Sequence, residues 1–335
     1  MVVINVEASS SSWLHSTGPE SLDDLGLISR PWPGAVATVP TRRPSPRPSP
    51  ELVPRGDGDL VMSASPGGIQ TVDGVLEALD AIIDRALEAG RRVGYFAALY
   101  RKVTAKVAEG IAAGFFDDGE RMERLDVAFA GRYLSALNTY EQGGKPTRSW
   151  QLAFHAAAST RPIILQHLLV GINAHINLDL GIAAAETAPG LALPALRRDF
   201  DRINDILAVL MAGIERDIAV ASPWIGFLGR IGGRRDDEIV RFSIEVARSE
   251  AWRLATELGP LARRDWGGPI GARDARVARL AGVVLNPGLL TAGLLVIRAR
   301  ESNDVRRNIE VLKGVEEPDL EVVEARVRQE RAATE

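Results

Sequence analysis

Apolar side chains recur every three or four residues along most of this chain. The first such run begins after Gln70 and places apolar residues at positions 75, 76, 79, 82, 83 and 86. This spacing gathers them on one face of an α-helix. Thr71 or Asp73 can cap the start of that helix, and Gly90 can end it. The pattern therefore predicts an amphipathic helix that begins near residue 71 and ends at Gly90.

The helical spacing continues through the rest of the chain. A second helix is predicted at about 92–113, and a third begins at Asp117 or Asp118 and ends before the glycines and proline at 143–146. The alternating β-branched runs that indicate strands are absent from the sequence. Further helices are predicted at about 147–158, 161–186, 194–220, 235–258, 272–286, 288–312 and 317–332. We expect an all-α fold, a single compact multi-helix bundle formed by residues 69–335.

One predicted helix is apolar nearly all round. Residues 161–181 are mostly leucine, isoleucine, valine, alanine and glycine, and the polar side chains set among them are His167, Asn173, His175, Asn177 and Asp179, with Gln166 beside them. A helix of this kind lies inside a protein, where each polar side chain needs a partner. The polar residues of this helix therefore indicate a metal or substrate site, or a buried hydrogen-bond network.

Helical geometry divides these polar residues between two faces. At 100° per residue, His175 and Asp179 lie about 40° apart on one face, while Asn173 and Asn177 lie together on another. His175 and Asp179 can therefore reach one point, as ligands of a single metal or as an imidazole oriented by a carboxylate. His167 lies two turns before His175 and joins the pair only if the site is elongated.

Two further residues are candidates to complete such a site. Asp126 shares a helical stripe with Phe129 and Tyr133, so we expect its carboxylate to point inward beside aromatic rings. His155 lies in a short aromatic segment with Trp150 and Phe154, and that segment can close over a pocket.

These considerations define the candidate residues. The candidate catalytic residues are His175, Asp179 and Asp126, and the candidate metal ligands are the same three together with His155 and His167. The chain has no cysteine, which excludes disulfides and thiolate catalysis. A metal would have to be held by His, Asp, Glu or Asn side chains, and one divalent zinc, iron or manganese ion suits such ligands.

Residues 1–68 differ in composition from the rest of the chain. They hold ten of the nineteen prolines and lack an apolar period long enough for a core helix. This composition predicts a disordered tail rich in proline, arginine and serine. Met62 stands just before the first predicted helix, and we favour it as the true start of translation. The alternatives are a tail that binds a partner and a protease site at 52–56 that was added for expression.

Charge and motifs narrow the range of functions. The net charge is −4 and basic residues are not interleaved with exposed aromatic residues, so we expect no nucleic-acid partner. Glycine-rich phosphate loops and nucleophile elbows are absent from the sequence. The apolar stretch 280–297 is divided at residues 286–288, Asn-Pro-Gly, into pieces too short to cross a bilayer. With no signal-peptide pattern, we expect a cytoplasmic protein without an integral membrane segment.

Three segments of the chain resemble a known family. They are Gln-His-Leu-Leu-Val-Gly-Ile-Asn-Ala-His-Ile-Asn-Leu-Asp-Leu-Gly at 166–181, Asp-Val-Ala-Phe-Ala-Gly-Arg-Tyr-Leu at 126–134 and Asp-Glu-Ile-Val-Arg-Phe-Ser-Ile-Glu at 237–245. Through these segments, residues 70–313 resemble an uncharacterised bacterial and fungal family, the domain of unknown function 5995. The resemblance covers most of the predicted helical domain and implies no particular activity.

The spacing of His175 and Asp179 carries a second resemblance. The all-helical zinc-dependent phospholipase C and single-strand nuclease families also present His-x-x-x-Asp from a helix to a metal cluster. The resemblance implies a one- or two-metal site on a helical scaffold. Those families use several more histidines and an N-terminal tryptophan as ligands, whereas this chain has three histidines after residue 68.

Three hypotheses follow from the polar cluster. The first, which we favour, is a metal-dependent enzyme, with hydrolysis of a lipid or another hydrophobic small molecule as the expected reaction. The second is a metal-free enzyme or binding protein whose apolar pocket uses His175 as acid, base or hydrogen-bond donor, oriented by Asp179. The third is a structural network in which the His, Asn and Asp side chains tie helix ends together.

Overall fold

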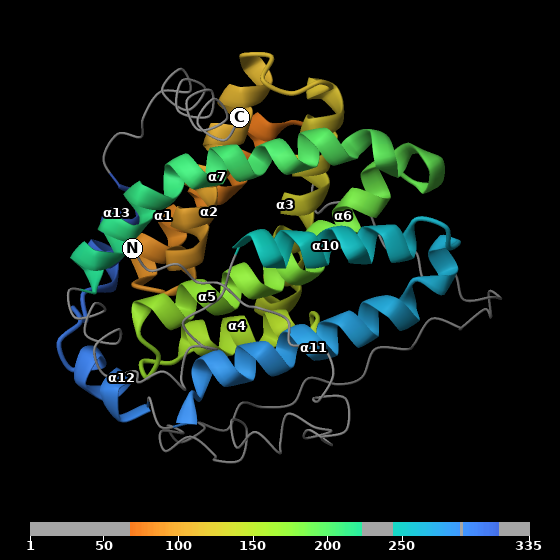
Figure 1. The fold of residues 1–335 in the computed structure, drawn as a ribbon. Helices are drawn as coiled ribbons and strands as arrows, with labels where there is room; N and C mark the ends of the chain where they lie inside the picture. Colours follow the sequence, from red (N-terminus) through yellow and green to blue (C-terminus); the bar gives the residue numbers. More distant parts are fainter. Residues whose placement is uncertain (1–67, 223–243, 289–290, 315–335) are drawn as a thin grey trace, which may run out of the picture. The chain divides into compact units, whose positions relative to one another are not determined.

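The computed structural model describes residues 68–222, 244–288 and 291–314. Every regular element within these ranges is helical, which confirms the predicted all-α fold. The predicted N-terminal tail, the start of the helix predicted at 235–258 and the helix predicted at 317–332 lie outside the described residues. The α-helices are α1 (Val72–Ala89), α2 (Val93–Ala112), α3 (Gly119–Glu141), α4 (Arg148–Ala158), α5 (Ile164–Ala174), α6 (Leu180–Thr187), α7 (Leu193–Ala221), α10 (Ile244–Leu258), α11 (Gly267–Leu285), α12 (Thr291–Arg298) and α13 (Val305–Lys313) (Figure 1).

A central helical segment at Ile164–Thr187 organises the other helices. It consists of α5, a π-helical turn at His175–Asp179 and α6. In this segment α5 packs against α2, α4 and α11, and α6 packs against α3 and α10 (Figure 1). The segment is long and apolar enough to cross a membrane, but 89% of its most apolar window is buried inside the protein. Its apolar side chains therefore serve the core, as the all-round apolar pattern predicts.

The N-termini of three core helices are capped by carboxylates from distant parts of the chain. Each carboxylate accepts hydrogen bonds of 2.7–3.2 Å from backbone N–H groups at the start of its helix. The first backbone N–H groups of a helix lack partners within the helix and carry partial positive charge, so a buried carboxylate stabilises that end. The pairs are Asp199 with α3, Asp274 with α4 and Glu301 with α5.

Two glycines allow the neighbours of the central segment to approach it closely. A Cβ atom at Gly171 would lie 2.6 Å from the ring of Phe96 in α2. A Cβ atom at Gly181 would lie 2.5 Å from the backbone carbonyl oxygen of Ala251 in α10. Real Cβ atoms essentially never make contacts shorter than 3.0 Å, so both positions require glycine for the observed packing.

The predicted helix ends can be compared with the observed ones. Thr71 caps α1 by accepting a hydrogen bond from the Gly74 N–H, and Gly90 ends α1 with a positive φ of 62°, as predicted. The prediction of one continuous helix at 288–312 is wrong, because the structure has two helices there. The first, α12, ends at Arg298, and the second, α13, begins at Val305. Asp304 supplies the new start by accepting a hydrogen bond from a backbone N–H of α13.

We expect Gly181→Ala to lower the free energy of unfolding by about 1–3 kcal/mol, because the added methyl group meets the α10 backbone, which cannot move aside as a side chain can. Gly271→Ala in α11 is the matched control, since nothing lies within 4 Å of its Cβ position. That substitution should stabilise the protein by about 0.5–1 kcal/mol. Urea unfolding of the two variants measures both effects, and equal stability of the two would contradict the close packing of α6 on α10.

Candidate functional site

His175 lies at the start of the π-helical turn, surrounded by aromatic rings. The imidazole stacks face to face on Phe129 of α3, with ring centroids 3.6 Å apart and planes inclined by 7°. The ring of Tyr100 in α2 meets it edge-on at 4.4 Å. Three further rings have centroids 5.7–6.2 Å from the centroid of the imidazole, namely those of Phe96, Tyr133 and Trp150. Three helices besides the central segment thus build the surroundings of this single histidine.

Asp179, one turn later, is a buried carboxylate with three neighbouring donors. It accepts hydrogen bonds from Nε of Arg132 at 3.0 Å and from Nε1 of Trp150 at 2.7 Å. Nδ1 of His175 lies 3.5 Å from Oδ2 of Asp179. The sequence-based expectation that His175 and Asp179 share a face is therefore confirmed. Arg132 and Trp150 were not predicted as partners, although both lie in the segments that supplied Asp126 and His155 as candidates.

The protonation of His175 follows from its surroundings. Burial lowers the pKa of His175, and Arg132 lowers it further, while the Asp179 carboxylate opposes both effects. The imidazole is therefore neutral near pH 7. A neutral imidazole that donates its Nδ1–H toward Asp179 carries a lone pair on Nε2. Nε2 of His175 is buried and makes no hydrogen bond with the described residues.

The π-helical turn brings His175 and Asp179 into line. Its backbone bond runs from the Leu180 N–H to the His175 carbonyl, five residues back, where an α-helix would reach back four. A π turn holds more residues than an α turn, so side chains four apart lie more directly above one another. Such turns are rare and often occur at functional sites.

Asp126 is the second acidic group of this region. It is 7% exposed, as the inward orientation predicted from its stripe requires. Burial raises the pKa of Asp126 to about 7, and the nearby Glu123 adds to the rise. Its Oδ2 atom is buried and makes no hydrogen bond with the described residues. Near neutral pH this carboxyl group therefore exists in both its protonated and its ionised form.

Several polar atoms of this region are buried without a hydrogen-bond partner among the described residues. Asp126 and Tyr133 are electrostatic neighbours of Tyr100, and Tyr100 in turn contacts the His175 ring. A buried polar atom without a partner costs about 1–3 kcal/mol, so these atoms can accept or donate hydrogen bonds to water or to a small polar molecule. The atoms are the hydroxyl of Tyr133, Oδ2 of Asp126 and Nε2 of His175, while the buried hydroxyls of Tyr100 and Thr104 lie close enough to interact with each other.

The asparagines occupy the other face of the central segment, as predicted. Nδ2 of Asn173 donates to the backbone carbonyl of Val277 in α11 at 2.9 Å. Nδ2 of Asn177 donates to Oδ1 of Asn173 at 3.0 Å. This pair has the bonds expected of a structural network and ties the central segment to α11. The His175–Asp179 face differs, because it bonds to side chains and leaves Nε2 without a partner.

The remaining two histidines lie away from the His175–Asp179 pair. His167 precedes His175 by two turns, about 12 Å along the helix axis, and its ring meets Tyr95 edge-on at 5.7 Å. Burial lowers the pKa of His167 to about 3, and Arg92 and Arg298 lower it further. His155 is exposed on α4, with its ring 5.6 Å from Tyr140. The structure thus keeps Asp126, His175 and Asp179 in one region of the core and leaves these two histidines outside it.

The fit of a metal ion can be judged from the side chains themselves. Among the described residues, no three His, Asp or Glu side chains lie close enough together to hold a metal ion. Asp179, the carboxylate nearest to His175, already accepts hydrogen bonds from an arginine and a tryptophan on its two oxygens. Within the described ranges, the predicted ligands therefore do not come together in a group of three or more, and binding of a metal by fewer of them stays a prediction.

Comparison with known proteins identifies the family. The model of a family of unknown function, DUF5995, matches residues 72–287. The chain belongs to this family. The match includes the central segment, Asp126 and the aromatic surroundings of His175, in agreement with the resemblance carried by those segments. No curated protein and no solved structure matches the chain, so the likeness to zinc-dependent phospholipases and nucleases gains no support.

The raised pKa of Asp126 predicts a pH-dependent stability. In the folded protein the carboxyl keeps its proton up to about pH 7, whereas in the unfolded chain it loses it near pH 4. Between these two pH values the folded state binds more protons than the unfolded chain. The contribution of Asp126 to the free energy of unfolding therefore falls by up to about 4 kcal/mol as the pH rises from about 4 to about 7. Asp126→Asn should remove this fall and be more stable than the wild type at pH 8.

Urea unfolding of the wild type and Asp126→Asn across this pH range measures the effect. The lowered pKa of His167 has the opposite effect on the free energy of unfolding. Its contribution to stability is lost as the pH falls toward about 3, the pKa of His167 in the folded protein. That contribution is common to both proteins and cancels in the difference between them. A difference in free energy of unfolding between the wild type and Asp126→Asn that does not change with pH would show that Asp126 ionises normally.

Proposed function

We propose that this protein is a metal-independent hydrolase of a small hydrophobic ester, with His175 as general base and Asp126 as general acid. The observation that carries the proposal is the buried, unpartnered Nε2 of a neutral His175 whose Nδ1 faces the Asp179 carboxylate. A carboxylate that fixes the tautomer of a histidine leaves its other nitrogen free to accept a proton. This arrangement supports the second of the three hypotheses more than a metal site.

The roles of the residues follow from their protonation. Nε2 of His175 accepts a proton from water while the water oxygen attacks the carbonyl carbon of the ester. Asp126, protonated in part near pH 7, donates its proton to the oxygen of the leaving alcohol. The proton held by His175 then returns to the Asp126 carboxylate through solvent, which restores both groups. The hydroxyls of Tyr100 and Tyr133 are buried donors that can hydrogen-bond to the carbonyl oxygen during the reaction.

The class of substrate follows from the surroundings. Phenylalanine, tyrosine and tryptophan rings enclose His175, so an apolar molecule with one polar, hydrolysable group matches the region. A strongly charged substrate would lose its hydration there without a matching ion pair, because Arg132 is already paired with Asp179.

The test is hydrolysis of p-nitrophenyl acetate, butyrate and octanoate by the full-length chain, prepared without a histidine tag. We expect His175→Gln to lower kcat/KM by at least about 100-fold, the usual share of a general base. His167→Gln is the matched control, because it removes an equally buried histidine of the same segment and should leave kcat/KM within a few-fold. Asp126→Asn should remove the dependence of the rate on a group that titrates near pH 7.

Elemental analysis and chelation separate this proposal from the metal hypothesis. Full activity after treatment with EDTA, and no stoichiometric zinc, iron or manganese, are the expected results. Stoichiometric metal that disappears in His175→Ala and Asp179→Ala would overturn the proposal in favour of a metal enzyme. Absence of hydrolysis across the three esters, with His175→Gln unfolded, would instead assign the histidine a structural role.

A further inference from the structure

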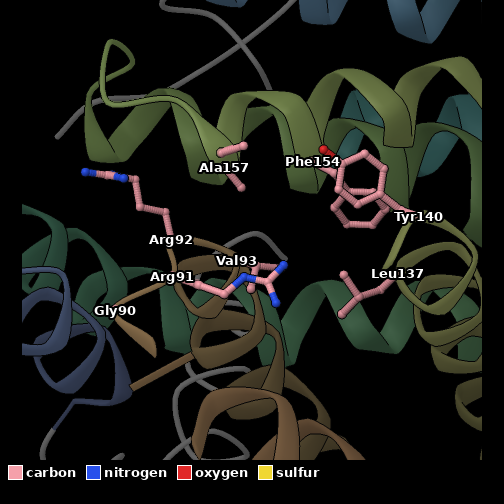
Figure 2. Close-up of a pocket in the computed structure, with 9 residues that line it drawn as sticks. Gly90, Arg91, Arg92, Val93, Leu137, Tyr140, Phe154 and Ala157 are labelled. Atoms are coloured by element: carbon pink, nitrogen blue, oxygen red, sulfur yellow. The ribbon is translucent and has the colours of Figure 1, made fainter. Parts of the chain in front are cut away.

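A separate pocket opens between the α1–α2 turn, α3 and α4. Its volume is about 250 Å³. One side is apolar and aromatic, formed by Leu137 and Tyr140 of α3 and Phe154 and Ala157 of α4 (Figure 2). The proposed catalytic residues His175, Asp179 and Asp126 do not line it. The pocket is therefore distinct from the site around His175.

The other side of the pocket is basic. Arg91 and Arg92, in the turn before α2, both line it (Figure 2). Arg91 pairs with Glu141 at 2.8 Å, and it lowers the pKa of Tyr140 against the effect of burial. The side chain of Arg92 forms no ion pair or hydrogen bond with the described residues. Burial raises the pKa of Tyr95 and the charge of Arg92 opposes that rise, whereas burial lowers the pKa of His167 and Arg92 lowers it further. Arg92 thus contributes a partly exposed guanidinium group, without an ion-pair partner among the described residues, to the lining of the pocket.

We infer that this pocket binds a small carboxylate with an aromatic or short aliphatic body. The guanidinium group of Arg92 matches a carboxylate in shape and charge, and it can donate two parallel hydrogen bonds to it. The rings of Phe154 and Tyr140 match an apolar body of limited size. The N-terminus of α2, which no side chain caps, adds positive potential on the same side. This inference does not depend on the proposed hydrolysis.

The two-sided lining of the pocket favours a small carboxylate with an apolar body over two other kinds of ligand. A free inorganic anion would use the arginines but leave the apolar wall exposed to water. A neutral hydrocarbon would use the wall but leave Arg92 without a counter-charge. Only a molecule that has both a carboxylate and an apolar body matches the basic side and the apolar side of the pocket. Each of these two groups should therefore contribute measurably to the affinity.

The experiment is titration of the full-length chain with phenylacetate by isothermal calorimetry at low salt, with phenylacetamide and inorganic phosphate as comparison probes. We expect phenylacetate to bind with a Kd of about 1 mM or tighter, and phenylacetamide and phosphate to bind at least about tenfold more weakly. Arg92→Gln should weaken phenylacetate binding by about tenfold or more. Arg264→Gln, an exposed arginine outside the pocket lining, is the matched control and should not change it.

A second variant tests the apolar side independently. Ala157→Phe places a ring in the pocket without changing charge, and it should abolish phenylacetate binding while the far-ultraviolet circular dichroism stays that of the wild type. Phosphate binding as tight as phenylacetate binding would overturn the inference, because the apolar wall would then contribute nothing. Absence of phenylacetate binding, or equal binding by the wild type and Arg92→Gln, would overturn it as well. None of these results depends on ester hydrolysis.

Discussion

The burial of a carboxylate within an apolar helix is the constraint on which the candidate site depends. Asp179 is 1% exposed, and an ion so far from water is tolerated only when donors replace its hydration. Arg132 of α3 and Trp150 of α4 supply those donors, so the requirement of one side chain fixes two helices against the central segment. His175 is oriented by the same carboxylate, and its position in the fold follows from that arrangement.

The core meets its other polar requirements in the same manner. Carboxylates from α7, from α11 and from the segment after α12 cap the N-termini of α3, α4 and α5, and the two asparagines tie the central segment to α11. Except for Asn177, which donates to Asn173 one turn earlier, each of these groups finds its partner at a large distance along the chain. Nε2 of His175 and Oδ2 of Asp126 depart from this rule, because they have no partner among the described residues, and so do other buried atoms such as the two ring nitrogens of His167. The proposed function rests on Nε2 of His175 and Oδ2 of Asp126, whereas the carboxylate caps and the asparagine pair serve stability.

The two regions of interest share the aromatic residues of α4. Phe154 lines the basic pocket and stacks on Trp150, with ring centroids 5.1 Å apart, and Trp150 donates to Asp179. A molecule that displaces Phe154 would therefore press on the tryptophan that holds the carboxylate of the site. The pocket and the site are distinct in their linings but connected by one pair of packed rings.

The sequence by itself determined the features that depend on local spacing. The apolar period of three to four residues predicted the helices, and Thr71, Gly90 and the Asn-Pro-Gly at 286–288 correctly marked helix ends, because caps and breakers act within one turn. The same period separated the His175–Asp179 face from the asparagine face, and it correctly predicted the burial of Asp126. These results need only the geometry of a single helix.

The tertiary structure decided everything that joins distant segments. The pairing of Asp179 with Arg132 and Trp150, and the basic pocket between the α1–α2 turn, α3 and α4, arise where helices meet. The sequence grouped His155 and His167 with His175 because they are close along the chain. The fold separates them, since eight residues of helix place His167 about 12 Å along the axis and α4 presents His155 on its exposed side. Spacing along one helix limits which side chains can meet, but the packing of several helices selects which of them do.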